Sequence, residues 1–122
     1  LPEGLPPLDA VTMVLFYHDT VWLGVNREAM NKAVFAALKP GGVWVIVDHS
    51  ARPGDGAKVT STFHRIEEDV VKSEVLAAGF VLDGQADFLR NNDDTRDWND
   101  SPRAAGERRG TSDRFVLRFR KP

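Results

Sequence analysis

The sequence predicts an α/β domain built on a mixed sheet of about four strands, with helices on the faces of the sheet. A strand, a helix and a second strand follow one another between residues 9 and 47. Both strands are nearly continuous in apolar residues, which is typical of parallel strands covered on both faces. The last segment of the chain alternates apolar and charged residues and follows no strong helix, which favours an antiparallel last strand.

The composition narrows the class of protein. With 42% hydrophobic and 28% charged residues, the 122-residue chain is ordinary for one globular domain. The formal net charge of -2 and the lack of a basic face predict no nucleic-acid partner. No run is long enough to span a bilayer, so we expect no membrane partner and a soluble protein. The absence of cysteine leaves cytoplasm and periplasm equally open.

The chain begins with a segment rich in proline and glycine, residues 1–8, which we expect to be a flexible arm. Asp9–Phe16 is the predicted first strand. The polar residues Tyr17, His18 and Asp19 follow at its carboxyl end, and residues 20–25 are expected to be a short connection. Ligands of open α/β sheets bind outside the carboxyl ends of the strands, so this position is a candidate site.

A helix, a tight turn and a buried strand come next. The helix is predicted over residues 26–38, with Asn26 as its N-cap. Pro40–Gly42 ends the helix and reverses the chain, because proline cannot continue a helix and glycine adopts positive φ readily. Val43–Val47 is the second strand, and the polar residues of Asp48–Ser50 follow it. The strand–helix–strand unit predicts parallel strands joined by a right-handed crossover.

The second half of the chain is less regular. Residues 58–65 suggest a loop with a helical turn, and a helix is predicted from the acids at 67–69 to Gly79, where a positive φ ends it. Residues 80–89 open a third strand. Residues 90–112 are polar without an apolar period and predict a long loop, which is usually functional or disordered. Residues 113–120 form the alternating last strand.

These segments, in this order, resemble the carboxyl-terminal half of class I S-adenosylmethionine-dependent methyltransferases. Asp9–Phe16 with Tyr17-His18-Asp19 resembles the fourth strand of that fold and its active-site end. Leu38–Asp48 resembles the "LKPGG" turn into the fifth strand, Ala77–Phe80 the "AGF" join to the sixth, and Asp113–Pro122 the seventh, antiparallel strand. The likeness is greatest to a bacterial family of predicted methyltransferases with Tyr-His-Asp, Asp-His-Ser and His-Arg-Ile segments at these places.

The resemblance implies a partial Rossmann-like methyltransferase fold. It also implies a sheet order in which the strand at Asp9 is followed by those at Val43, Asp113 and Phe80. The glycine-rich loop and the ribose-binding acid of that family have no counterpart in these residues, and the only G-x-G, Gly54–Gly56, favours a turn. We therefore expect a truncated or partial domain that is not competent for methyl transfer alone. The alternative is a non-catalytic, self-associating remnant of the fold that binds a small ligand or is purely structural.

Seven residues are the candidate site, and the first four of them end or follow the first strand. His18 and Asp19 are predicted to be catalytic, since a histidine can act as a base near neutral pH; the alternative is that they cap a strand end. Phe16 and Tyr17 are predicted to pack against the cofactor, and Tyr17 is also a candidate catalytic residue. The cofactor implied is S-adenosylmethionine, with weak or no binding to this chain alone, and the substrate is a small molecule.

The other candidate catalytic residues follow later strands and loops. For His49 the alternative is a solvated loop histidine. For His64 and Arg65 the alternative is that the arginine pairs with the neighbouring acids at 67–69 on a wet surface instead of binding a carboxylate substrate. A metal site built from the three histidines and Asp19 lacks local ligand spacing, so no metal is predicted.

The strand Asp9–Phe16 also predicts a partner. In the complete fold this strand lies inside the sheet, whereas here its outer neighbour is missing. An apolar edge without lysine or proline is a template for pairing with another strand. We therefore predict a homodimer in which two copies of Asp9–Phe16 pair antiparallel about a two-fold axis.

Overall fold

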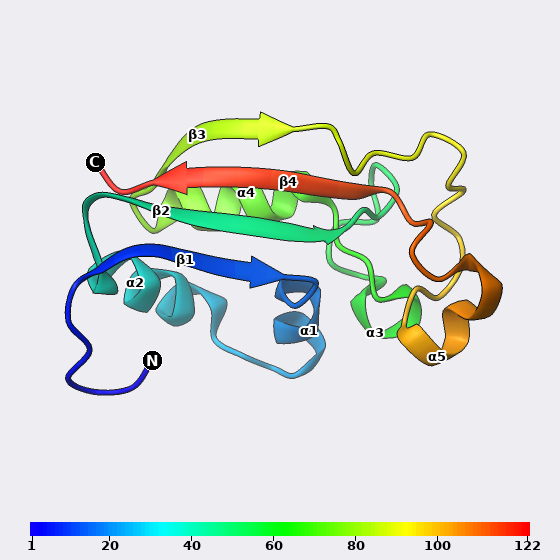
Figure 1. The fold of residues 1–122 in the computed structure, drawn as a ribbon. Helices are drawn as coiled ribbons and strands as arrows, with labels where there is room; N and C mark the ends of the chain where they lie inside the picture. The colour runs from blue at the N-terminus through cyan, green and yellow to red at the C-terminus, as the bar shows by residue number, and fades with distance from the viewer.

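The computed structural model describes residues 1–122 and contains one four-stranded sheet with the order β1-β2-β4-β3 (Figure 1). Strands β1 (Leu8–Val14) and β2 (Leu38–His49) run parallel, and β4 (Arg114–Arg120) runs antiparallel to β2 and to β3 (Val81–Ala86). The predicted α/β class, the mixed sheet with its antiparallel last strand and the order of the strands are confirmed.

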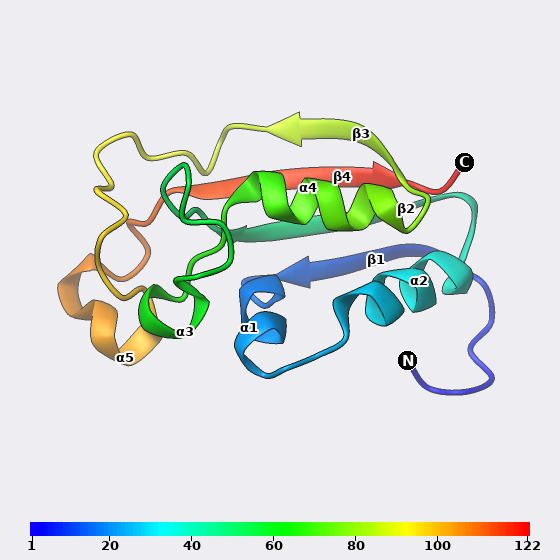
Figure 2. The same ribbon diagram turned by 180° about the vertical axis from the view of Figure 1, so that it is seen from behind.

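The two longest helices, α2 (Arg27–Ala37) and α4 (Glu68–Ala77), lie against the same face of the sheet (Figure 2). Between them and the sheet lies the core, because alternate residues of each strand point to this face. The opposite face carries no helix, and Val43, Val45 and Val47 are only partly buried there. The core residues from the strands and α4 are Leu38, Trp44, Ile46, Val71, Val75, Phe115, Leu117 and Phe119.

The cap of α2 and the tight turn predicted after this helix are both present, and the turn lies within the first residues of β2. The side chain of Asn26 accepts a hydrogen bond from the Ala29 amide, 3.0 Å away, and so caps α2. Gly41 has a φ of +80°, and a Cβ on Gly42 would lie 2.9 Å from the carbonyl oxygen of Lys39. Strand β2 begins at Leu38 and not at the predicted Val43, because Leu38 already pairs with Leu8 of β1. The turn is accommodated as a shift of the pairing register before Val43.

The first strand is shorter than predicted, and a helix follows it. Strand β1 ends at Val14, Leu15 reverses the chain with a φ of +55°, and α1 (Tyr17–Trp22) occupies part of the predicted connection. The prediction of a connection at residues 20–25 is therefore wrong for residues 20–22, which belong to α1. A helix of this length shows too little apolar period to be detected, and its first turn is held by a tertiary contact to β2.

Residues 90–112 are not a structureless loop. They contain α5 (Pro102–Ala105) and a 3-10 turn (Gly106–Arg108), and they lie beside α3 (Thr60–Phe63), the predicted helical turn (Figure 1). Buried ion pairs and hydrogen bonds, rather than an apolar stripe, hold this segment in place. Because polar contacts hold the segment in place, its sequence shows no hydrophobic period from which the structure could have been predicted.

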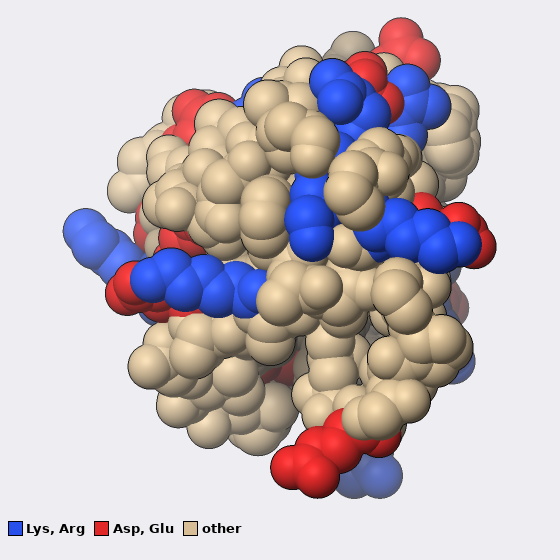
Figure 3. Space-filling view, turned by 90° about the vertical axis from the view of Figure 1, so that its left-hand side faces the viewer, with Lys and Arg blue, Asp and Glu red and all other residues tan.

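No helix of this chain is long and apolar enough to cross a membrane. At the end of the molecule that carries the termini, basic and acidic side chains are interspersed with uncharged surface, without a large area of one sign (Figure 3).

Candidate functional site

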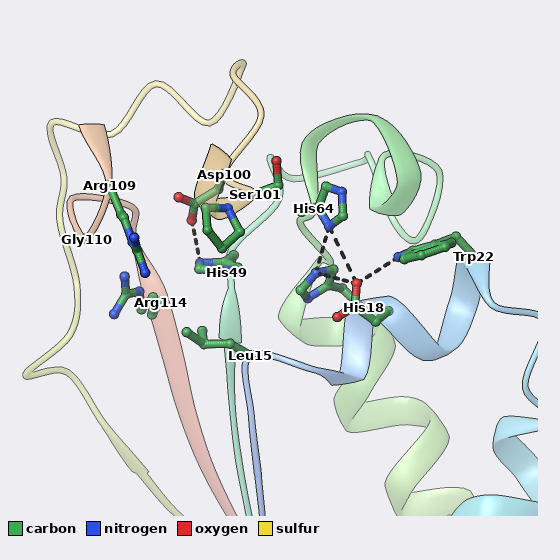
Figure 4. Close-up of a pocket in the computed structure, with 12 residues that line it drawn as sticks. Leu15, His18, Trp22, His49, His64, Asp100, Ser101, Arg109, Gly110 and Arg114 are labelled. Atoms are coloured by element: carbon green, nitrogen blue, oxygen red, sulfur yellow. Dashed lines mark hydrogen bonds and ion pairs between the residues drawn. The ribbon is translucent and has the colours of Figure 1, made fainter. Parts of the chain in front are cut away.

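A polar cavity of about 430 Å³ lies where β1 and β2 end. Its walls come from α1, α3 and the segment that precedes β4 (Figure 4). Four of the predicted site residues line it, although they come from three separate parts of the chain: His18, Asp19, His49 and His64. The position at the carboxyl ends of the parallel strands is the one expected for ligands of open α/β sheets.

Asp48 joins the end of β2 to the start of α1. Its fully buried carboxylate accepts hydrogen bonds from the backbone amide of His18, at 2.7 Å, and from that of His49, at 2.8 Å. The ring Nδ1 of His18 lies 2.7 Å from the same carboxylate. Because an ionised carboxylate can only accept, this contact places a proton on Nδ1 and leaves Nε2 of His18 facing the cavity.

The same environment perturbs the imidazole of His18. Burial disfavours its charged form, but the hydrogen bond and charge of Asp48, with the charges of Asp19 and Asp100, outweigh burial and raise the pKa of His18 above its ordinary value. His18 is therefore held in position and kept electron-rich by buried carboxylates.

His49 is paired with a second buried acid. Its Nδ1 lies 2.5 Å from a carboxylate oxygen of Asp100 and 2.9 Å from the hydroxyl of Ser112. Burial raises the pKa of Asp100, but the hydrogen bonds from His49 and Ser112 outweigh it and hold the pKa below its usual range. Only 6% of His49 is exposed, so the alternative of a solvated loop histidine is wrong.

His64 completes the wall on the side of α1. It has a left-handed backbone, with φ 53° and ψ 46°, and its Nδ1 lies 3.3 Å from Nε2 of His18. Asp19 meets both rings, and the indole Nε1 of Trp22 donates a 2.8 Å hydrogen bond to its carboxylate (Figure 4). Helices α1 and α3 thus bring together side chains that lie far apart in the sequence.

Two predicted cofactor contacts lie outside the cavity. Tyr17 is fully buried under α2 and α4: its hydroxyl donates to Glu74, at 2.8 Å, and accepts from Asn31, at 2.9 Å. Burial is the largest cause that raises its pKa above the ordinary value for tyrosine. Phe16 is 47% exposed and does not line the cavity. The catalytic role of Tyr17 and the cofactor contacts of both residues stay predictions.

Arg65 is also outside the cavity, at the centre of a buried network. It is fully buried, its guanidinium makes two hydrogen bonds to Asp94, of 2.7 and 3.1 Å, and it lies 4.6 Å above the ring of Trp98. The expected pairing with the acids at 67–69 is wrong. Glu68 instead pairs with Arg90, and Glu67 accepts from backbone amides, so neither is available to Arg65.

Sequence reasoning missed the basic wall of the cavity. Arg109 and Arg114 line the side away from His64, and neither guanidinium pairs with a carboxylate (Figure 4). Nε of Arg114 donates only to the hydroxyl of Ser112, at 3.3 Å. The only signal in the sequence was that arginines cluster with aspartates and serines in residues 90–114. Nothing in their spacing indicated that two of these arginines lie beside the histidines.

The buried acids of this region predict how stability depends on pH. Burial raises the pKa of Asp94, but hydrogen bonds from Arg65 and from backbone amides outweigh it and hold the pKa below its usual range. A carboxyl whose pKa is lowered by folding stabilises the protein fully above its unfolded pKa, about 3.9 for Asp, and loses that contribution as the pH falls through the folded value.

We therefore expect the urea midpoint of unfolding to fall as the pH decreases from about 5 to about 3. The Asp94→Asn variant is expected to be less stable at pH 5 and to show a shallower decline. A midpoint that is the same across this range, or an equal decline in the variant, would contradict the assignment.

The parallel β1–α2–β2 unit, the antiparallel β3–β4 pair and a polar cavity at the ends of the parallel strands define a methyltransferase-like α/β fold. The chain is similar to three solved structures along 98–100% of its own length. They are the [4+2]-cyclase SpnF (TM-score 0.62, 17% identity), a putative methyltransferase in complex with the Haloferax volcanii Trm112 activator (0.60, 17%) and a SAM-dependent methyltransferase from Methanosarcina mazei (0.62, 12%).

The chain spans 52%, 57% and 63% of these three proteins, respectively. At such low identity the likeness concerns the fold. No protein-family model and no curated protein matches the sequence.

Proposed function

We propose that this chain takes part in S-adenosylmethionine-dependent methyl transfer and that its cavity holds the methyl acceptor. One observation carries the proposal: the polar cavity lies at the carboxyl ends of the parallel strands, in a fold that the M. mazei SAM-dependent methyltransferase shares along 98% of the chain. Open α/β sheets bind their ligands at this edge.

In this reaction a lone pair of the acceptor attacks the methyl carbon in line, a new bond to carbon forms and the carbon–sulfur bond of the sulfonium breaks. The protein contributes mainly by bringing the two reactants together and excluding water. Arg109 and Arg114 are guanidinium groups without a carboxylate partner on the cavity wall. A guanidinium binds carboxylates and phosphates with paired hydrogen bonds, so the acceptor we propose is a small molecule with an acidic group.

The acceptor is tested by ligand-observed NMR with a panel of small carboxylates, phosphates and their neutral analogues. Binding of the anionic compounds is expected, and Arg109→Gln and Arg114→Gln are expected to weaken it about tenfold or more. The control is Arg103→Gln, an exposed position of α5 outside the cavity. Neutral compounds that bind as well as the anionic ones would contradict an acidic acceptor. Methyl transfer itself is tested by incubating the chain and a compound that binds with S-adenosylmethionine labelled on its methyl group.

We expect this chain alone to bind S-adenosylmethionine weakly or not at all. These 122 residues contain no glycine-rich loop after a strand, and Gly54 and Gly56 lie in a turn outside the cavity lining. Polar groups of that kind carry much of a cofactor's affinity, and half a site leaves the ligand mostly in water. Calorimetry is expected to show no saturation at about 100 µM, and a low-micromolar dissociation constant would refute the expectation.

The second candidate function is a non-catalytic domain that binds a small ligand. One observation favours it: these 122 residues contain no glycine-rich loop after a strand. The fold alone does not determine methyl transfer either, since SpnF shares it along the whole chain and is a [4+2]-cyclase. Labelled methyl groups that reach none of the bound compounds, even at millimolar S-adenosylmethionine where weak binding is populated, would support this candidate over the first.

We also propose that the chain forms a two-fold homodimer through β1. Strand β1 is an outer strand of the sheet, so one row of its backbone amides and carbonyls has no partner strand. It contains neither lysine nor proline, and Val14 is 58% exposed. Antiparallel pairing of two copies would continue the sheet across the axis and cover these groups.

Light scattering at low micromolar concentration is expected to give the mass of a dimer. The Val14→Lys variant is expected to be monomeric, because a charge at the carboxyl end of β1 would be buried in the strand pair at a high cost. A monomeric unmodified chain, or a dimer that Val14→Lys leaves intact, would count against pairing through β1.

A further inference from the structure

We propose that His18, Asp19 and His64 bind a divalent transition-metal ion, with Zn²⁺ as the ion that matches them best. One nitrogen from each ring and one carboxylate oxygen lie within 4.8 Å of one another in this His18–Asp19–His64 cluster. Two imidazoles and a carboxylate are a common donor set for zinc with an open fourth position.

The separations of the three donor atoms agree with one face of a tetrahedron. Nε2 of His18 lies 3.1 Å from Oδ1 of Asp19 and 3.3 Å from Nδ1 of His64, and the last two atoms are 3.5 Å apart. Zinc bonds of about 2.0–2.1 Å in a tetrahedral site place the ligand atoms about 3.3 Å from one another. An octahedral ion at the same separations needs bonds of about 2.3 Å, the range of Ca²⁺, which takes oxygen ligands instead.

The hydrogen-bond directions also call for a cation between these atoms. Nδ1 of His18 donates to Asp48, so Nε2 of a neutral His18 presents a lone pair. It faces the carboxylate oxygen of Asp19, which is an acceptor as well. Two acceptors at this distance repel each other unless a proton or a metal ion lies between them. Asp48 binds the other nitrogen of the His18 ring, and the indole of Trp22 donates to the carboxylate of Asp19. Neither contact engages Nε2 of His18, so its lone pair points into the cluster.

The atoms around the cluster hold the ligands in the way that metal sites require. The buried carboxylate of Asp48 orients His18, an arrangement that recurs behind metal-binding histidines. The indole of Trp22 orients Asp19. His64 adopts a left-handed backbone, which is uncommon outside glycine, and this conformation brings its ring to the cluster.

The cluster lies on the wall of the cavity, with Arg109 and Arg114 on the side away from His64 (Figure 4). A bound ion would therefore have its fourth position open to a ligand in the cavity, where an anionic oxygen is the complementary donor. The metal site does not depend on methyl transfer, so its test uses binding of the metal alone.

The experiment titrates the metal-free 122-residue chain with Zn²⁺ by calorimetry and with Co²⁺ by visible absorption. We expect one Zn²⁺ per chain with a dissociation constant in the micromolar range or below, and the intense absorption of four-coordinate Co²⁺. Asp19→Asn and His64→Asn are each expected to weaken zinc binding at least about tenfold. Loss of a residue that only hydrogen-bonds to a metal ligand already lowers metal affinity by about 10–100-fold. Asparagine keeps the size of Asp19 and tolerates the left-handed backbone at residue 64.

The control is His49→Gln. The chain has three histidines, so this variant removes the only imidazole outside the cluster, and it is expected to keep the affinity for zinc. Circular dichroism melting of each variant shows whether it remains folded; a folded variant of the cluster that binds as tightly as the parent overturns the proposal. So does the absence of saturable binding at about 100 µM Zn²⁺, or an equal loss of affinity in His49→Gln.

Discussion

Replacement of Arg65 with methionine is expected to lower the free energy of unfolding by about 3–5 kcal/mol. The variant leaves the carboxylate of Asp94 buried without its charged partner, since neither side chain is exposed in the parent. It also removes the hydrogen bonds to the backbone carbonyls of Ser50 and Trp98, of 3.0 and 3.1 Å. These two contacts tie residues 90–112 to the end of β2, so their loss is expected to loosen the cavity wall.

Urea unfolding followed by tryptophan fluorescence measures this loss, and Trp98 lies directly against the altered position. The matched control is Arg52→Met, which breaks an exposed ion pair with Asp55 and is expected to change stability by no more than about 1 kcal/mol. If Arg65→Met costs as little as Arg52→Met, the buried pair with Asp94 is not what holds the segment.

The Asp48→Ala variant is expected to lose about 3 kcal/mol or more. Its carboxylate satisfies the backbone amides of His18 and His49 as well as the ring of His18. Each buried donor left without an acceptor costs about 1–3 kcal/mol. The start of α1 would lose its attachment to β2, so we also expect faster amide hydrogen exchange in α1 than in β2.

The control for this variant is Asp9→Ala at the start of β1. Asp9 is paired with Lys39, but 84% of its side chain is exposed, so the change is expected to stay within about 1 kcal/mol. Hydrogen exchange that rises evenly over the chain, instead of first in α1, would show that Asp48 does not specifically fix that helix.

How far the sequence predicts the fold can be seen in particular elements. The strand–helix–strand unit was readable because Val43–Val47 is a continuous apolar run and α2 has a capped apolar stripe. The last strand was readable because Phe115, Leu117 and Phe119 alternate with a face that is mostly charged, and all three are fully buried. The antiparallel direction of β4 was predicted because no strong helix precedes it. The strand order required the resemblance in addition, since hydrophobic pattern does not fix which strands are neighbours.

The candidate site divides along similar lines. His18, Asp19, His49 and His64 were chosen from their positions after strands or in a polar loop, and the structure places all four in one cavity. Tyr17 was chosen for the same reason but points into the core, because a helix starts at this residue and turns its ring toward Trp44. The direction of a side chain at a strand end depends on the next turn of the chain, which a six-residue helix does not reveal in its pattern.

The sequence by itself determined the parts of this protein that rest on local pattern: the apolar strands, the stripe and cap of α2, the glycines of the turn at the start of β2 and the polar residues at the strand ends. Only the tertiary structure decided which polar residues meet. Asp48 reaches back to His18, Asp94 pairs with Arg65, and Asp100 pairs with His49 over long separations in the chain. Hydrophobic periodicity reports which face of an element is buried, whereas the partner of a buried charge depends on distances that exist only after the sheet, α3 and residues 90–112 have packed together.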